Sequence, residues 1–308
     1  MCLAVGQNLQ TMRPIIERWN GSSWSVVPSP NPGAASTLNA VACMSSTDCF
    51  AVGEAGTNPL AERWNGTSWK IAALPTTAGA GVLNAITCPS ATNCFAVGTL
   101  ISISDDASGT LVERWNGANW SLAPSPNSSG AYNTLSDVSC TSSSNCMAVG
   151  GSQTFFRDNR RTLAQRWNGS TWVVVSSPNR PGYNELSSVA CVSATNCTAV
   201  GKSANGTGGS TLAESTLAET WNGTRWSLAS TPNRSGAYNS RLNGLACPAS
   251  NICFAVGSSS TDVAESTLVE RTPLDTPALL NRAGPTAQTS GSAASRACVA
   301  SRCGAEPV

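Results

Sequence analysis

Ten of the thirteen cysteines form five pairs with one common spacing, and these pairs are the clearest chemical feature of the sequence. Each pair encloses five residues, rich in Ser, Thr and Asn. Between two antiparallel strands, such a loop places its flanking residues opposite one another, within the Cα separation that a disulfide tolerates. Five hairpin disulfides, and therefore an oxidising compartment, are expected. The pairs are Cys43 and Cys49, Cys88 and Cys94, Cys140 and Cys146, Cys191 and Cys197, and Cys247 and Cys253.

The chain contains no histidine. This removes the commonest general base and the commonest metal ligand, and it excludes a Ser/His/Asp triad. Zinc is a poor alternative for the cysteines, because a structural zinc site needs four ligands and each pair supplies two. We therefore expect neither a metal site nor a cofactor.

Charge and hydropathy exclude two further classes of partner. The formal net charge is +1, only 11% of residues are charged, and the 18 Lys and Arg form no run. This argues against nucleic acid. No apolar stretch approaches the ~18 residues that a membrane helix needs, so we expect no membrane insertion. A protein or a glycan remains as the expected partner.

Carboxylates could still support a glycosidase, which needs two of them about 5 to 10 Å apart. A catalytic pair should break a sequence repeat, and Asp105, Asp106 and Asp158 do so, in loops where acids are more often simply solvated. Five glutamates instead occupy one repeated position. We expect no catalytic residues, and a glycosidase is the least favoured alternative. The repeated glutamates are Glu17, Glu62, Glu113, Glu219 and Glu270.

An internal repeat runs through most of the chain. The motif C-x-A-V-G recurs six times, from Cys2 to Cys253, at intervals of 45 to 56 residues. All ten tryptophans fall in five copies of W-N-G-x-x-W. The tryptophan pairs are Trp19 and Trp24, Trp64 and Trp69, Trp115 and Trp120, Trp167 and Trp172, and Trp221 and Trp226.

One repeat, starting at Leu38, reads LNAVAC, CFAVG, PLAERW and WKIAALP between loops of Gly, Asn, Ser and Pro. These segments predict four short strands, and the Asn-Gly step between the last two predicts a hairpin turn. Four strands about every 50 residues are typical of a propeller blade rather than of a sandwich, and a solenoid is the alternative. The predicted fold is an all-β, six-bladed propeller with one disulfide per blade.

A single propeller over residues 1–308 would close by combining both ends of the chain. Blade 1 would consist of about 1–33 and a C-terminal strand near 295–299. In this arrangement Cys298 is in register to pair with Cys2, and Cys303 has no partner in the repeat. The alternative is that the sequence starts late and that upstream residues hold a signal peptide and further blades, with Thr272 to Ser295 as a tail. The other predicted blades are about 36–77, 81–128, 133–179, 184–233 and a degenerate 240–285.

The order Ala51-Val52-Gly53, then Glu62-Arg63-Trp64, then Trp69 resembles the kelch repeat. The kelch double glycine occurs only at Gly150-Gly151. In detail, the paired cysteines and W-N-G-x-x-W look more like uncharacterised propellers in secreted proteins of actinobacteria. The resemblance implies a propeller fold and an export route, but no reaction.

The repeated Glu-Arg-Trp triplet could hold a sugar through bidentate hydrogen bonds and ring stacking. The structural alternative is that Glu and Arg form salt bridges between blades around a buried tryptophan. The candidate sugar sites are Glu62, Arg63, Trp64, Glu113, Arg114 and Trp115.

The loops after the second strand of each repeat differ most in sequence, and divergent loops on a constant frame are where recognition usually resides. One of them combines aromatic and basic residues, which suits an interface hot spot. The predicted function is therefore a secreted or cell-surface binding or scaffold protein that uses these loops, with a lectin as the alternative. The candidate binding loop contains Phe155, Phe156, Arg157, Arg160 and Arg161.

Overall fold

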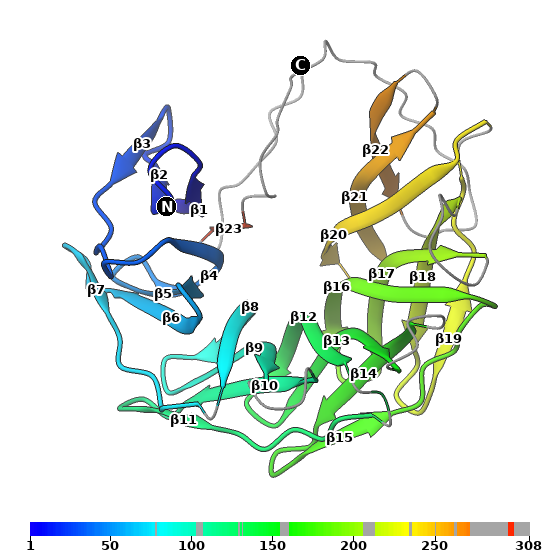
Figure 1. Cartoon of the computed structure of the whole chain (residues 1–308), viewed down its shortest axis with the longest axis horizontal. Coiled ribbons are helices and arrows are strands. Elements are labelled where there is room, and N and C mark those ends of the chain that lie inside the picture. Colours follow the sequence, from blue (N-terminus) through cyan, green and yellow to red (C-terminus); the bar gives the residue numbers. More distant parts are fainter. Residues whose placement is uncertain are drawn as a thin grey trace. The chain divides into compact units, whose positions relative to one another are not determined.

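A computed structural model describes residues 1–77, 79–102, 107–128, 130, 132–154, 160–205, 213–233, 236–249, 251–261 and 264–271, and the backbone of 295–298. All regular secondary structure in these residues is β-strand (Figure 1). None of them forms a helix that could cross a membrane. The chain divides into two compact units, the first Met1–Asp106, Leu111–Ala123 and Gln288–Val308, and the second Ala107–Thr110 and Pro124–Ala287.

The first unit holds three sheets of four strands each, with antiparallel neighbours. Sheet 1 has the order β23 (Ser295–Cys298), β1 (Cys2–Asn8), β2 (Arg13–Trp19) and β3 (Trp24–Val27). Sheet 2 consists of β4 (Ser36–Ser45), β5 (Asp48–Ala55), β6 (Asn58–Trp64) and β7 (Trp69–Ile71). Sheet 3 consists of β8 (Ala80–Ser90), β9 (Asn93–Ile101), β10 (Ser108–Trp115) and β11 (Trp120–Leu122).

The second unit repeats this pattern. Sheet 4 consists of β12 (Tyr132–Ser142), β13 (Asn145–Gln153), β14 (Arg161–Trp167) and β15 (Trp172–Val175). Sheet 5 consists of β16 (Tyr183–Ser193), β17 (Asn196–Ala204), β18 (Glu214–Trp221) and β19 (Trp226–Ala229), and sheet 6 of β20 (Asn239–Ala249), β21 (Ile252–Ser260) and β22 (Glu265–Arg271). The start of β10, up to Thr110, also belongs to this unit. Single parallel bridges connect Ser108 to Tyr132 and Glu214 to Asn239.

The five predicted disulfides are confirmed. Each joins the first two strands of sheets 2 to 6, with Cα separations of 4.0 to 4.1 Å. They close the hairpins because the residues before and after each five-residue loop face each other in the antiparallel register, as Cys43 and Cys49 do. The repeat, the four strands per sheet and the disulfide of each hairpin were therefore readable from the sequence.

The glycine of C-x-A-V-G lies opposite a β-bulge. Leu38 pairs with Gly53, and the next pair is Ala40 with Val52, so one residue of β4 is extra. A Cβ on Gly53 would overlap the carbonyl oxygen of Thr37, so the bulge can form only opposite glycine. The same overlap occurs at Gly98, Gly150, Gly201 and Gly257.

Neighbouring sheets pack through the tryptophan pairs. In the first unit, the Phe50 ring lies 5.1 Å from the rings of both Trp115 and Trp120, edge-on to each. Phe254 holds the equivalent position in sheet 6 but is 40% exposed, and Val256 beside it is also exposed. Within the second unit, the described residues leave this face of sheet 6 uncovered. The closed six-bladed arrangement stays a prediction.

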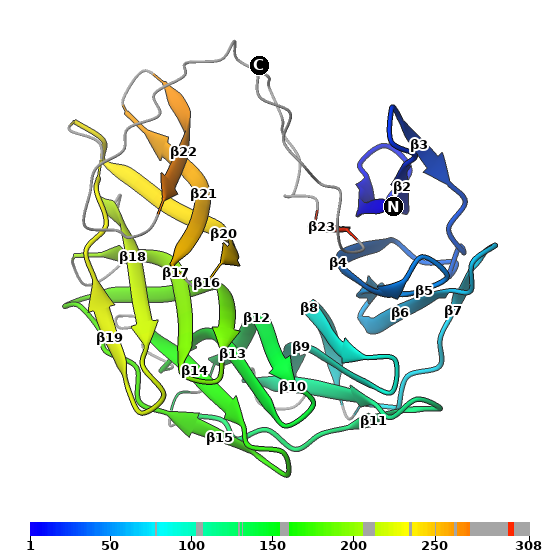
Figure 2. The ribbon, with the colours of Figure 1, turned by 180° about the vertical axis from the view of Figure 1, so that it is seen from behind.

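Strand β23 lies beside β1, the first strand of the chain, in sheet 1 (Figure 2). In this antiparallel pair Cys298 stands opposite Cys2, and Cys2 is disulfide-bonded. We propose a Cys2–Cys298 disulfide, and mass spectrometry of a non-reducing digest should find the peptide that joins them. A Cys2–Cys303 peptide, or unmodified Cys2, would refute this pairing. The predicted last strand of the sixth blade, after residue 271, lies outside the described residues.

Candidate functional site

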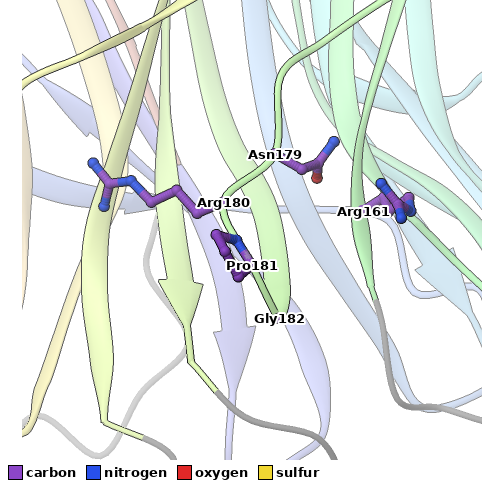
Figure 3. Close-up of a pocket in the computed structure, with 5 residues that line it drawn as sticks. All are labelled: Arg161, Asn179, Arg180, Pro181 and Gly182. Carbon is purple, nitrogen blue, oxygen red and sulfur yellow. The ribbon is translucent and has the colours of Figure 1, made fainter.

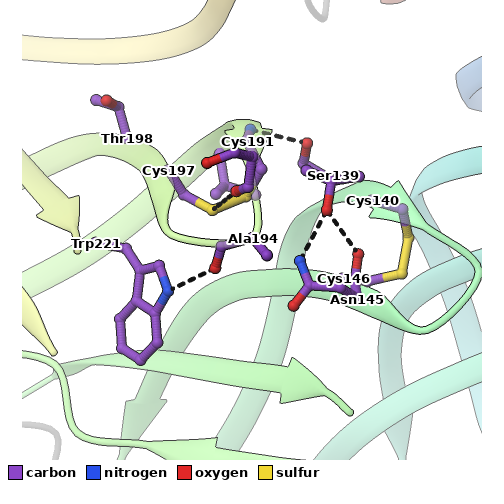
Figure 4. The surroundings of a disulfide bond; sticks show 12 residues. Ser139, Cys140, Asn145, Cys146, Cys191, Ala194, Cys197, Thr198 and Trp221 are labelled. Atoms are coloured by element: carbon purple, nitrogen blue, oxygen red, sulfur yellow. Dashed lines mark hydrogen bonds between the residues drawn. A yellow bond between two sulfur atoms is a disulfide. The ribbon is translucent and has the colours of Figure 1, made fainter. Parts of the chain in front are cut away.

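The sheets have two chemically different ends. At one, called here the disulfide end, the C-x5-C loop lies beside the W-N-G turn. In sheet 5 the indole Nε1 of Trp221 donates to the carbonyl oxygen of Ala194 at 3.2 Å (Figure 4). This bond ties the turn to the disulfide loop. The same bond joins Trp64 to Ser46, Trp115 to Ala91 and Trp167 to Ser143.

The first tryptophan of each of these pairs is therefore a structural residue, and sheet 3 offers a matched test. Trp115 and Trp120 are both buried, but only Trp115 has an Nε1 partner among the described residues. Replacing Trp115 with Phe should lower the free energy of unfolding by about 1 kcal/mol more than Trp120→Phe, because Trp115→Phe also removes the hydrogen bond to the Ala91 carbonyl oxygen. Urea unfolding of the two variants measures the difference. Equal losses would show that the Ala91 bond does not stabilise the fold.

The predicted sugar-binding triplet is mostly inside the protein. Glu62, Trp64, Glu113 and Trp115 are buried, which favours their structural role over sugar binding. Arg114 packs its guanidinium over the Phe95 ring, at 5.6 Å from the centroid. These side chains present neither a ring face nor a free carboxylate to a ligand.

The salt bridge predicted between Glu and Arg of neighbouring sheets is wrong for Arg63. Its guanidinium forms a bidentate pair with Asp48 of its own sheet, at 2.9 and 3.1 Å, and lies 5.0 Å from the Trp115 ring. Asp48 directly precedes Cys49, so the disulfide hairpin supplies a closer carboxylate than the next sheet does. At the equivalent place in sheet 4, Arg166 donates through Nε and Nη2 to the single oxygen Oδ1 of Asn145, at 3.3 and 3.2 Å.

The repeated glutamates of sheets 2, 3, 5 and 6 are buried, and none of them forms an ion pair with a described residue. Burial raises the pKa of Glu113 to about 8 and those of Glu62, Glu219 and Glu270 to about 7. Ser29 donates to both oxygens of Glu62 at 2.9 Å, whereas neither oxygen of Glu113 has a partner among the described residues. These are buried acids that hold their protons to a higher pH than an exposed glutamate does, and they do not face solvent.

The other end of the sheets, called here the loop end, carries the variable loops and the linkers between sheets. Of the predicted binding loop, Phe155, Phe156 and Arg157 lie outside the described residues, as do the acids Asp105, Asp106 and Asp158. Arg160 and Arg161 are described, and both belong to a larger group of polar side chains in sheets 4 and 5. We call this group the charged cluster, and it comprises Arg160, Arg161, Arg180, Tyr183, Glu185, Lys202 and Glu214.

Two ion pairs organise the charged cluster. Arg160 Nη2 lies 2.9 Å from Glu185 Oε1, and the Tyr183 hydroxyl donates to Glu185 Oε2 at 2.8 Å. Lys202 Nζ lies 2.7 Å from Glu214 Oε1 and 5.4 Å from the centroid of the Tyr183 ring. Burial and the charge of Glu185 raise the pKa of Tyr183, so its hydroxyl stays a donor.

Gly151 makes room for Arg160. A Cβ there would lie 2.8 Å from Arg160 Cζ and 2.9 Å from Nη2, closer than real Cβ atoms come. In the double glycine Gly150-Gly151, the first glycine therefore lies opposite the bulge and the second lies against the Arg160 guanidinium.

A hollow of about 380 Å³ opens next to these ion pairs. Its lining is Arg161, Asn179, Arg180, Pro181 and Gly182 (Figure 3). The Arg180 side chain points away from Arg161 and donates through Nη1 to Thr216 O at 3.0 Å. Arg161 is exposed, and neither arginine pairs with a carboxylate among the described residues.

Sequence reasoning identified two members of the charged cluster and missed five. A signal was present, because the positions that hold charge in sheets 4 and 5 hold mostly uncharged residues in other repeats. Arg160 corresponds to Thr57 and Ser108, and Glu185 to Thr37 and Val82. The described residues contain no group of three His, Cys, Asp or Glu side chains that could hold a metal ion.

No protein-family model and no curated protein matches this sequence. Several solved structures are similar to this chain in fold. A protein of unknown function from Dyadobacter fermentans is 10% identical with a TM-score of 0.55, over 84% of this chain and 83% of its own. An ulvan lyase of a new polysaccharide-lyase family, bound to GlcA(1-4)Rha3S, is 10% identical with a TM-score of 0.52, over 83% and 69%. YCF48 bound to the D1 peptide is 15% identical with a TM-score of 0.49, over 88% and 78%.

The two structures with the higher TM-scores share the repeated four-stranded sheets described above. This likeness, at 10% identity, shows the fold. The chain is an all-β protein of the β-propeller class, and each four-stranded sheet is a blade.

Proposed function

We propose that this protein is a secreted, non-enzymatic binding propeller that recognises its partner through the loop end of sheets 4 and 5. The observation that carries this proposal is the charged cluster. Charge is sparse in this chain, at 11% of residues, yet seven charged or phenolic side chains gather in sheets 4 and 5, and several of them, such as Glu185 and Lys202, stand where most other repeats have an uncharged residue. Residues that depart from a structural repeat are the ones that the fold does not require.

The repeated features support the proposal because they have structural roles. The cysteines close hairpins, the first tryptophans bond to the disulfide loops, and the repeated glutamates of sheets 2, 3, 5 and 6 are buried. These form a rigid frame, and loops on a rigid frame carry recognition in many folds. The five disulfides fit an oxidising environment, which supports secretion.

Arrays of glycans and of extracellular proteins, probed with the oxidised protein, would test this function. Arg161→Glu should abolish the strongest binding signals, because it reverses an exposed charge at the hollow. The matched control is Arg225→Glu, an exposed arginine in the W-N-G turn of sheet 5, at the disulfide end. Signals that persist in Arg161→Glu, or that both variants lose equally, would contradict a site at the loop end.

A further inference from the structure

The charged cluster has an excess of positive charge that its own ion pairs do not cancel. Glu185 is matched by Arg160, and Glu214 by Lys202. Arg161 and Arg180 are then left without a carboxylate among the described residues, in a protein whose formal net charge is +1. An exposed guanidinium in this position attracts an anionic group and can bind a carboxylate or a sulfate through two hydrogen bonds.

The two arginines have different roles at the hollow. Arg180 is held by Ser203 Oγ at 3.3 Å and by Thr216 O, so it contributes charge rather than a mobile contact. Arg161 is exposed and has its donors available. Beside it, Asn179 uses Oδ1 to accept from Thr162 N at 2.8 Å and one Nδ2 hydrogen to bond Ser177 O. The second Nδ2 hydrogen can donate to a ligand oxygen.

The lining also discriminates between ligands. Protein interfaces rely on buried aromatic or aliphatic anchors, and no large exposed apolar residue of the described chain lies in the charged cluster or the hollow. The Tyr183 hydroxyl is taken by Glu185, and Lys202 lies over its ring. What is offered is a guanidinium, an amide and backbone in a small space, which suits a ligand covered with hydroxyl and acidic groups.

We infer that the hollow binds an acidic saccharide, with its carboxylate or sulfate on Arg161 and a hydroxyl on Asn179. This inference rests on the proposed function and names the class of ligand. A uronic acid and a sulfated sugar offer the same chemistry here, and the experiment separates them.

Calorimetric titrations of the oxidised protein would use four probes: a galacturonic acid oligomer, a heparin-derived sulfated oligosaccharide, a neutral galactan oligomer and poly-glutamate. We expect binding of at least one acidic saccharide, weakening as salt rises from 50 to about 500 mM. Arg161→Gln should weaken it about tenfold, the usual effect of losing one charge-assisted hydrogen-bonding partner. Arg225→Gln should leave it unchanged. Circular dichroism should show both variants folded, because both side chains are exposed.

The outcomes separate the inference from the function on which it rests. The acidic probe that binds more tightly identifies the acidic group: the galacturonic acid oligomer indicates a carboxylate, and the heparin fragment indicates a sulfate. Arg161-dependent binding of poly-glutamate or of the neutral oligomer alone would overturn the acidic-saccharide inference and leave the loop end as the binding site. Acidic saccharides that bind Arg161→Gln as tightly as the unmodified protein would overturn the assigned site. If the ligands found on the arrays also bind Arg161→Glu as tightly as the unmodified protein, the proposed function is overturned as well.

Discussion

Urea should unfold this protein at a clearly lower concentration at pH 8 than at pH 5. The expectation comes from four buried glutamates that occupy the same strand position in sheets 2, 3, 5 and 6. They are Glu62, Glu113, Glu219 and Glu270. Burial raises their pKa values from the ordinary 4.5 to about 7 or 8. Their folded-state pKa lies above the unfolded value, so the folded protein holds protons that the unfolded chain has released.

The stabilising effect of these protons is fully present below about pH 4.5 and is lost as the pH rises through 7 to 8. One carboxyl whose pKa rises from 4.5 to about 7 accounts for on the order of 3 kcal/mol. Four such groups would make a difference comparable to the whole stability of an ordinary domain. Equilibrium urea unfolding at half-unit steps from pH 5 to pH 8 measures this effect.

Sheet 4 supplies the control, because it holds Gln165 where the other sheets hold glutamate. Gln165 is buried and its Nε2 donates to the Pro126 carbonyl oxygen at 2.8 Å, so the position accepts an amide. Glu113→Gln should therefore raise stability at pH 8 and reduce the slope of stability against pH. A free energy of unfolding that does not change with pH in the unmodified protein would show that these carboxyls are hydrated or paired with a cation. A slope unchanged in Glu113→Gln would assign it to other groups.

The sequence predicted the frame because its signals are local. The Cys43 to Cys49 spacing and the Asn-Gly turn after Trp64 depend on few neighbouring residues, and their geometry follows from the chain itself. The role of Glu62 could not be predicted from neighbouring residues, because its hydrogen-bond donor is Ser29, which lies 33 residues away in the sequence. Likewise the partner of Arg63 is an acid of the preceding hairpin, and only the register of β5 and β6 brings Asp48 close.

The charged cluster escaped prediction for a similar reason. Arg160 precedes β14, Glu185 is in β16 and Lys202 in β17, so no single stretch of sequence contains the group. The binding loop predicted from the sequence, around Phe155 and Arg157, lies outside the described residues. Comparing equivalent positions between repeats, rather than reading each loop alone, is the sequence procedure that would have found the cluster.

Gly98→Ala should destabilise the protein far more than Gly6→Ala, although both glycines close a copy of the C-x-A-V-G motif. A Cβ on Gly98 would overlap the carbonyl oxygen of Val82 and lie 2.9 Å from Leu83 Cα, both in the backbone of the neighbouring strand β8. Backbone cannot rotate aside as a side chain can, so β8 and β9 must separate at the bulge, next to the fully buried Leu83 and Val97. Overpacking of this kind costs about 3 kcal/mol or more.

Gly6 is the control, since it closes the same C-x-A-V-G motif in sheet 1. Among the described residues, a Cβ on Gly6 meets Ile15 Cγ2 at 3.7 Å, an ordinary contact. Gly6→Ala should therefore change the urea midpoint little, while Gly98→Ala should lower it strongly or prevent folding. If both variants unfold at the midpoint of the unmodified protein, the strands can open at the bulge without loss, and the repeated glycine is not explained by its position opposite the bulge. A large loss in both would instead assign the glycine a role that does not depend on the overlap seen at Gly98.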